Sequence, residues 1–280
     1  MIDDKKIVFC GLPASGKTTF LGALSYLAEN SDDNNALKLV ELQEQRYFFN
    51  SLADTWVGCE PMMRTKVDSQ DSIEMTLSDL GLTFNVEMPD LSGETWASIW
   101  AEHEVSPEVN HLLSQCTSVA FFIHVDNIST PLSLSEENSM LQGSSRIGPL
   151  SEPLEVWDAN KHASTQAVTV DLLIKASSMM QGANKRVAII LSAWDTVSPD
   201  DQSPQNFISI QMPLLYQYLN SRLDFRDFKV YGVSAQGGCL TKQKDALLDI
   251  DDPTHRIKVI ENEGAQHNDL TKILSWLVNE

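Results

Sequence analysis

Eight residues near the N-terminus carry the clearest chemical signal in the sequence. They run from Gly11 to Thr18, read GLPASGKT, and match the pattern G-x-x-x-x-G-K-[ST] in full. The two glycines let the backbone curl so that successive N–H groups point at phosphate oxygens. We expect Lys17 to reach the β- and γ-phosphates of a nucleotide and Thr18 to bind Mg²⁺, while the following helix presents its positive N-terminal end to the anion.

Asp90 and Gly93 form a second candidate motif, D-x-x-G, after a run that alternates apolar and polar residues. An Asp at the end of a strand beside the phosphate loop is placed to hold Mg²⁺ through water. The glycine lets a backbone N–H approach the γ-phosphate with no side chain in the way. The motif alone is weak, because Asp and Gly mark any turn, and it gains weight from the strand before it.

Two later apolar runs end in residues suited to recognising a base. One leads into Ser192-Ala193-Trp194-Asp195 and the other into Ser234-Ala235-Gln236. Ligands of open α/β sheets bind at the carboxyl ends of the strands, so these motifs and the phosphate loop converge on one edge. A carboxylate there accepts the N1–H and the exocyclic amine of guanine, whereas adenine offers no N1–H. The alternative for Asp195 is a simple capping residue.

The elements that must position these motifs follow an α/β pattern. Short β-branched runs alternate with amphipathic stretches, which is typical of a mainly parallel sheet with helices on both faces. Two strictly alternating runs joined by Asp79-Leu80-Gly81 predict one antiparallel edge hairpin. Buried parallel strands are predicted at 5–10, 119–125, 186–191 and, as the last strand, 228–233; helices are predicted at 18–29, 165–180 and 270–277, and helix starts at Ser106-Pro107 and Ser203-Pro204.

We expect residues 1–280 to form a single domain enlarged by three insertions. The first, at about 31–60, carries an extra helix over roughly 39–56, and the second, 127–163, is rich in Ser and Pro. The third, 237–267, contains several aspartates and is predicted to be a solvated acidic loop. Its aspartates lack the alternate spacing and central Gly of a calcium loop.

Composition and charge exclude several classes of protein. The 20 basic and 39 acidic residues give a formal charge of −19, which argues against nucleic acid and anionic membranes as partners. No apolar run approaches the roughly 20 residues of a membrane span, and the first residues lack the build of a signal peptide. The four cysteines, at 10, 59, 116 and 239, show no metal-binding spacing. We expect a cytoplasmic protein.

The order of these motifs resembles that of the Ras-like GTPases of the TRAFAC class, which are small-GTPase-like P-loop NTPases. More narrowly, GLPASGKTTFL together with Asp90-Leu91-Ser92-Gly93-Glu94 looks like the bacterial double-GTPase proteins. The resemblance covers the chain in order, apart from the irregular stretches 127–163 and 237–267. It implies GTP or GDP with Mg²⁺ as ligands, a protein partner at the switch regions such as a second GTPase, and a role in bacterial conflict or defence.

The resemblance also implies roles for individual positions. Mg²⁺ would be held by Thr18, with Asp90 acting through water. Asp195 would recognise the base, together with Ser192 and with support from Ser234 and Ala235. Phosphate binding would fall to Gly11, Pro13, Ala14, Ser15, Gly16, Lys17, Thr18, Thr19 and Gly93.

Two positions depart from the pattern of these GTPases. Ala193 stands where a lysine is usual, so no aliphatic stem covers the guanine plane, and Trp194 occupies the variable position beside it. Glu94 stands where many small GTPases carry a glutamine that orients water. A carboxylate can orient or deprotonate water but adds negative charge beside the γ-phosphate, so slow hydrolysis is expected.

The threonine of the first switch should lie between the first helix and the hairpin. Thr65, 25 residues before Asp90, is the candidate for this catalytic and metal-binding position, with Thr55 as the alternative. Arg64 is either an arginine that acts in cis on transition-state charge or an ordinary surface residue. Trp96, Ile99 and Trp100 share one helix face, which predicts either core or a partner interface.

The sequence thus predicts a GTP-binding protein that uses Mg²⁺ and hydrolyses GTP slowly as a regulatory switch. One alternative is an ATPase or phosphotransferase of the wider P-loop class. The other is an interaction module that a nucleotide stabilises but that no longer hydrolyses it.

Overall fold

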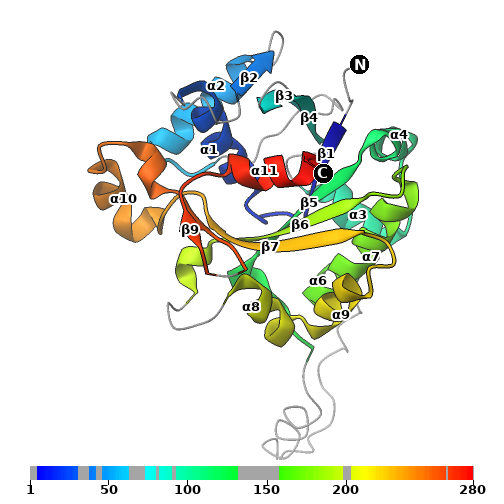
Figure 1. Cartoon of the computed structure of the whole chain (residues 1–280). Helices are drawn as coiled ribbons and strands as arrows, with labels where there is room; N and C mark the ends of the chain where they lie inside the picture. Colours follow the sequence, from blue (N-terminus) through cyan, green and yellow to red (C-terminus); the bar gives the residue numbers. More distant parts are fainter. Residues whose placement is uncertain are drawn as a thin grey trace, which may run out of the picture.

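A computed structural model describes most of the chain. The described residues are 5–30, 38–41, 46–62, 73–79, 82–89, 93–131, 158–197, 203–262 and 264–279. Within these ranges, nine strands form one sheet in the order β2-β3-β4-β1-β5-β6-β7-β8-β9. Helices cover both faces of this sheet (Figure 1). The predicted α/β class with a mainly parallel sheet is confirmed.

The centre of the sheet is parallel, as the continuous apolar runs predict. It consists of β4 (Leu82–Met88), β1 (Lys5–Cys10), β5 (Ser118–His124), β6 (Arg186–Ser192) and β7 (Asp227–Ser234). All seven residues of β6 are buried, as befits a strand covered on both faces. The parallel register brings the last residues of β1, β5, β6 and β7 to one edge of the sheet.

The predicted hairpin is formed by β3 (Ile73–Asp79) and β4, with Ile73 opposite Met88 and Asp79 opposite Leu82. A further strand, β2 (Lys38–Glu41), pairs antiparallel with β3 and lies outside the hairpin. The prediction of a helix over 39–56 is therefore wrong in its first part, because 38–41 pair with the open edge of β3. The helix itself, α2, runs from Arg46 to Val57.

At the other edge the structure corrects two predictions. β7 is not the last strand, because β8 (Lys258–Ile260) pairs antiparallel with it and β9 (Gln266–His267) pairs with β8. The segment 237–267 is also not a solvated loop: it includes α10 (Leu240–Leu248) and the 3₁₀ turn η3 (Pro253–Arg256). Ile257 and Val259 are fully buried. This apolar run, Ile257 to Ile260, is short and is interrupted by Lys258, so it makes no clear pattern in the sequence.

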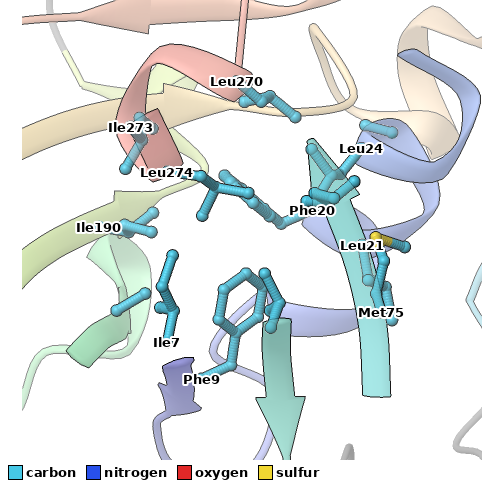
Figure 2. Close-up of a cluster of buried hydrophobic side chains, with 14 of the residues drawn as sticks. Ile7, Phe9, Phe20, Leu21, Leu24, Met75, Ile190, Leu270, Ile273 and Leu274 are labelled. Atoms are coloured by element: carbon cyan, nitrogen blue, oxygen red, sulfur yellow. The ribbon is translucent and has the colours of Figure 1, made fainter. Parts of the chain in front are cut away.

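One face of the sheet is covered by α1 (Lys17–Asn30), α2 and α11 (Thr271–Val278). Phe9, Phe20 and Phe122 pack there with ring centroids 5.1–5.7 Å apart. Figure 2 shows side chains of α11 approaching those of α1 and the strands in this core. The last carbonyls of α11 accept hydrogen bonds from side chains of the sheet, which satisfies this helix end inside the protein.

Among the described residues, five helices cover the opposite face of the sheet, and Ser-Pro pairs in the sequence predict where two of them start. Ser106 and Ser203 accept backbone hydrogen bonds at the starts of α4 and α8, each before a proline, as predicted. Of the insertion at 127–163, residues 132–157 lie outside the described ranges. The five helices are α3 (Glu94–Glu102), α4 (Pro107–Gln115), α7 (Thr165–Met179), α8 (Pro204–Gln211) and α9 (Pro213–Ser221).

None of the helices in the described ranges is both long enough and apolar enough to cross a membrane.

The packing of α11 on the sheet yields a stability prediction. Leu274 is fully buried and Leu223 is 85% exposed. Leu274→Ala removes buried methyl groups and leaves a cavity, so we expect it to lower the free energy of unfolding by about 2–5 kcal/mol. Leu223→Ala, the control, should change it by less than about 0.5 kcal/mol. Chemical denaturation of both variants measures this, and equal effects would show that α11 contributes little.

Candidate functional site

A cavity of about 560 Å³ lies at the carboxyl ends of the parallel strands. It is lined by the turn after β1 and by residues at or just after the ends of β5, β6 and β7. Because β5 and β6 separate β1 from β7 in the sheet, the turn after β1 lies at one end of the cavity and the end of β7 at the other. The structure therefore has a cavity where the sequence predicts ligand binding, at the carboxyl ends of the parallel strands. Of the predicted site residues, it is lined by Pro13, Ala14, Ser15, Gly16, Lys17, Thr18, Thr19, Glu94, Ser192, Asp195, Ser234 and Ala235.

The glycine loop packs directly against the end of β6. The Ser192 hydroxyl donates a hydrogen bond of 2.8 Å to the carbonyl of Ser15. Gly16 has a φ of +91°, and a Cβ at this position would lie 2.7 Å from Ser192 Oγ. Only glycine fits this backbone and this contact. The bond thus joins the predicted phosphate loop to the strand that carries Asp195.

Lys17 lies inside the curl of the loop, with 2% of its surface exposed. Its Nζ donates hydrogen bonds to the carbonyls of Gly11 and Leu12, at 2.7 and 3.0 Å, and to Ser15 Oγ at 3.2 Å. The ammonium charge is thereby held against carbonyl and hydroxyl oxygens of the loop. Beside the loop, burial raises the pKa of the Cys10 thiol well above its ordinary value, despite the nearby charge of Lys17, so this thiol remains neutral.

Gly93 closes the other side of the loop. It lies just before α3 with a φ of +80°, and a Cβ there would lie 2.6 Å from the carbonyl oxygen of Gly11. Glu94, the first residue of α3, is exposed and lines the cavity. The start of α3 therefore rests on the phosphate loop. Movement of either segment must be accommodated by the other.

Three predicted residues, Arg64, Thr65 and Asp90, lie outside the described residues. Thr55, the alternative switch threonine, is part of α2, and its hydroxyl donates a hydrogen bond of 2.7 Å to the carbonyl of Ser51 in the same helix. It does not line the cavity.

At the far end of the cavity, side chains from two neighbouring strands meet. Ser234 is the last residue of β7, and its hydroxyl donates a hydrogen bond to Oδ1 of Asp195, which follows β6. Ser234 Oγ in turn accepts a hydrogen bond of 3.1 Å from the backbone N–H of Gly237. Asp195 is exposed to the cavity while Ser234 is buried. The hydrogen bond from Ser234 thus orients the Asp195 carboxylate, and these are two residues that the sequence predicted to act together.

Trp194 does not take the place of the missing lysine. Its ring packs on the backbone of Gly232, where a Cβ would lie 2.4 Å from the indole. It also makes an edge-to-face contact with Phe207, with the two ring centroids 5.3 Å apart. The side chain belongs to the core on the far face of the sheet and does not line the cavity.

Several cavity residues were not predicted from the sequence. His124 ends β5 and Asp126 follows it, and the Thr196 hydroxyl donates a hydrogen bond of 2.9 Å to Asp126 Oδ1. The strand-end rule that selected Ser192 could have found both. A further group, from the segments after α2 and around the start of α10, carried no sequence signal: Glu60, Met62, Gly238, Cys239 and Leu240.

Cys239 contributes an exposed thiol to the cavity lining. Hydrogen bonding with the Thr241 side chain and with the backbone N–H groups of Thr241 and Lys242 lowers the pKa of this thiol. These contacts stabilise the thiolate, the form that reacts with electrophiles.

The aromatic residues of α3 settle one open alternative. Trp96 and Ile99 are 1% and 4% exposed and belong to the core beneath α3. Trp100 is half-buried, and its indole N–H donates a hydrogen bond of 3.0 Å to the carbonyl of Ala159. The core interpretation of this helix face is therefore correct.

The donor set of the cavity fits a magnesium ion. Mg²⁺ prefers oxygen ligands and is usually held by one or two protein groups, with phosphates and water completing its shell. The Thr18 hydroxyl, in the first turn of α1 and lining the cavity, is such a group. In the described part of the chain, no three His, Cys, Asp or Glu side chains are grouped so as to hold a metal by themselves.

A glycine loop between a buried strand and a helix, at the carboxyl edge of a mainly parallel sheet, defines a P-loop nucleotide-binding protein. The family model described as Double-GTPase 1 matches residues 8–277. The chain therefore belongs to the Double-GTPase 1 family and has a GTP-binding fold.

Three of the solved structures with detectable similarity are distant from this chain. The bacterial selenocysteine-specific elongation factor EF-Sec is 12% identical with a TM-score of 0.38, covering 87% of this chain and 27% of that one. The Ski7 GTPase-like domain of S. cerevisiae is 14% identical with a TM-score of 0.43, covering 83% and 43%. The small GTPase Arl6 of Trypanosoma brucei is 12% identical with a TM-score of 0.34, covering 88% and 95%. No curated protein matches the sequence.

The contact between Gly93 and the phosphate loop yields a prediction with a matched control. Gly182 has a φ of +90°, close to that of Gly93, but a Cβ there meets nothing within 4 Å. Both alanine variants bear the strain of a positive φ, about 1–2 kcal/mol. Gly93→Ala should lose about 1–3 kcal/mol more, because its Cβ overlaps the loop.

We also expect Gly93→Ala, and not Gly182→Ala, to weaken nucleotide binding. Denaturation curves and titration with a fluorescent nucleotide measure the two effects. If both variants bound nucleotide like the parent protein, the start of α3 would be independent of the loop.

Proposed function

We propose that the protein binds GTP with Mg²⁺ and hydrolyses it slowly to GDP, as a regulatory switch. The observation that carries the proposal is the layout of the cavity. A buried lysine and a threonine hydroxyl line one end, and a carboxylate held by Ser234 lies at the other. A phosphate chain with its metal fits the first end, and a base with adjacent N–H donors fits the second.

The base end favours guanine. Asp195 can accept the N1–H and the exocyclic amine of guanine, and its hydrogen bond from Ser234 keeps it oriented for both. Adenine has no N1–H and would place an acceptor against the carboxylate. Discrimination by such groups can be large, because the wrong base leaves them unpaired. Membership of a GTPase family supports this choice over the ATPase alternative.

The phosphate end would be served by the loop from Gly11 to Thr19 and by the backbone of Gly93. Lys17 would exchange hydrogen bonds with loop carbonyls for contacts with β- and γ-phosphate oxygens. Thr18 would bind Mg²⁺ directly, with Thr65 as a second ligand and Asp90 acting through water. When bound, the ion would neutralise charge that develops on the phosphate oxygens.

Hydrolysis would depend on Glu94. It is the first residue of α3 and lines the cavity beside the loop. Its carboxylate can orient or deprotonate a water molecule, but it also adds negative charge near the γ-phosphate, so the rate should be low. Arg64 would offset transition-state charge in cis.

We also propose the wider setting that the family suggests. The chain would act as one GTPase-like domain, with a protein partner, such as a second GTPase, at the segments around Thr65 and Gly93. Its process would be bacterial conflict or defence. The charge of −19 argues against nucleic acid and anionic membranes as partners, and the four free cysteines suit the reducing cytoplasm.

The base assignment is tested by Asp195→Asn. We expect GTP binding to weaken by about 10- to 100-fold, because base donors lose a charged acceptor. Binding of xanthosine triphosphate should improve relative to GTP, since its exchanged oxygen suits an amide donor. Competition with ATP, GTP and XTP on both proteins measures this. A parent protein that prefers ATP would replace the GTPase proposal with the ATPase one.

The hydrolysis assignment is tested by single-turnover release of phosphate from bound GTP. The parent protein should release phosphate slowly, and Glu94→Ala should reduce the rate by about 100-fold or more, as expected for loss of a group that positions or deprotonates water. GTP affinity, measured in parallel, should change little. No release by a parent protein that binds GTP would favour the non-hydrolysing module.

A further inference from the structure

The inserted helix α2 ends against the loop that follows β7. Trp56, near the end of α2, is fully buried, and its indole N–H donates a hydrogen bond of 2.9 Å to the carbonyl of Ala235. The amide of Gln236 donates in the opposite direction, to the carbonyl of Trp56 at 3.3 Å. Two reciprocal bonds therefore join the helix end to the segment that lines the base end of the cavity.

Arg256 also contacts the end of α2. It lies at the end of η3 and is 3% exposed. Its guanidinium donates hydrogen bonds to the carbonyl of Val57, at 2.9 Å, and to Cys59 Sγ, at 3.1 Å. Its central carbon lies 5.8 Å from the centre of the Trp56 ring. A cation at the C-terminal end of a helix is stabilising. Because the guanidinium is buried, losing these acceptors would cost free energy.

The same arginine touches the loop through its backbone. Gly237 has a φ of +87°, and a Cβ there would lie 2.4 Å from the carbonyl oxygen of Arg256. The N–H of Gly237 donates to Ser234 Oγ, whose hydroxyl donates to Asp195. An unbroken series of contacts thus runs from the end of α2 to the base-recognising carboxylate.

The contact between α2 and Arg256 also fixes the chain that follows α2 and runs along the cavity. Cys59 is fully buried and accepts hydrogen bonds from both Arg256 and Gln236. The next residues, Glu60 and Met62, line the cavity. The candidate switch residues Arg64 and Thr65 come soon after Met62 in the sequence. One buried anchor therefore serves both the base loop and the chain that enters the first switch.

We propose that Trp56 and Arg256 are positioning residues that set the guanine selectivity of the site. They hold the 234–237 loop, and through Ser234 the Asp195 carboxylate, against the end of α2. The inference rests on the proposed recognition of guanine by Asp195, and it goes further because neither residue touches the base. It also gives the segment 237–267 a function, since this segment carries Arg256 to the loop.

The chain contains a matched control for this pair. Arg186 is 8% exposed, donates a hydrogen bond of 2.9 Å to the carbonyl of Trp276 near the end of α11, and has its guanidinium carbon 5.6 Å from the Trp276 ring centre. As with Arg256 and Trp56, a buried guanidinium donates to a carbonyl near a helix end and lies close to an indole ring. However, Arg186 begins β6, whereas Ser192 and the cavity are at the other end of that strand.

The experiment compares Trp56→Phe and Arg256→Lys with Trp276→Phe and Arg186→Lys. Trp56→Phe keeps a buried aromatic ring but loses the N–H donor to Ala235. Arg256→Lys keeps the charge but replaces the planar guanidinium, whose terminal nitrogen donates to Val57 and Cys59, by a compact ammonium. The readout is the ratio of the dissociation constants for ATP and GTP, which does not depend on the fraction of folded protein. We expect this ratio to fall by about 3- to 10-fold in the first two variants, as for loss of one hydrogen bond. It should stay at the parent value in the controls.

A second test uses the parent protein alone. Binding of GDP should slow hydrogen exchange at residues 56–60 together with 234–237, since one anchor holds both. An unchanged ratio in both site variants, equal losses in the controls, or no protection of 56–60 would overturn the inference while the GTP preference of the parent protein stands. A parent protein with no preference for GTP would instead overturn the proposed function, and this inference with it.

Discussion

The hydrogen bond from the Ser192 hydroxyl to the Ser15 carbonyl is the interaction on which the site depends. It fastens the glycine loop, which would otherwise be a turn between β1 and α1, to the end of a fully buried strand. The close approach of Gly16 to the same hydroxyl leaves no room for a side chain. The two ends of the cavity are therefore parts of one rigid unit, and the distance between a phosphate site and a base site is set by the sheet.

Neither Ala193 nor Trp194 can cover a bound base in the way that a lysine side chain would. Ala193 provides no stem to cover a base, and Trp194 is turned into the opposite core by its contact with Gly232. The loop after β7, which lines the cavity, is instead held by contacts among Trp56, Ala235, Gln236 and Arg256. Fixing a loop from the protein side can orient hydrogen-bonding groups as effectively as covering the base, because orientation decides whether the carboxylate meets its donors.

The same architecture links the two segments expected to sense the γ-phosphate. Gly93 touches the phosphate loop on one side, and α3 then continues into a core that includes Trp96 and Ile99. On the other side, the end of α2 leads past Glu60 and Met62 along the cavity wall. Both segments start from buried, well-packed anchors. Packed interfaces of this kind favour discrete arrangements over gradual deformation, which is what a nucleotide-dependent switch requires.

The sequence by itself determined the local features of this protein. The GLPASGKT loop, the strands with continuous apolar runs, the hairpin and the Ser-Pro helix starts all rest on residues within one turn or strand, where spacing is visible along the chain. Only the tertiary structure decided that β2 extends the hairpin, that 237–267 folds onto β7, and that Trp56 meets Arg256, 200 residues away. The reason is physical: such contacts arise when an open sheet edge and a helix end find partners in space, and a partner far along the chain leaves no period in the sequence.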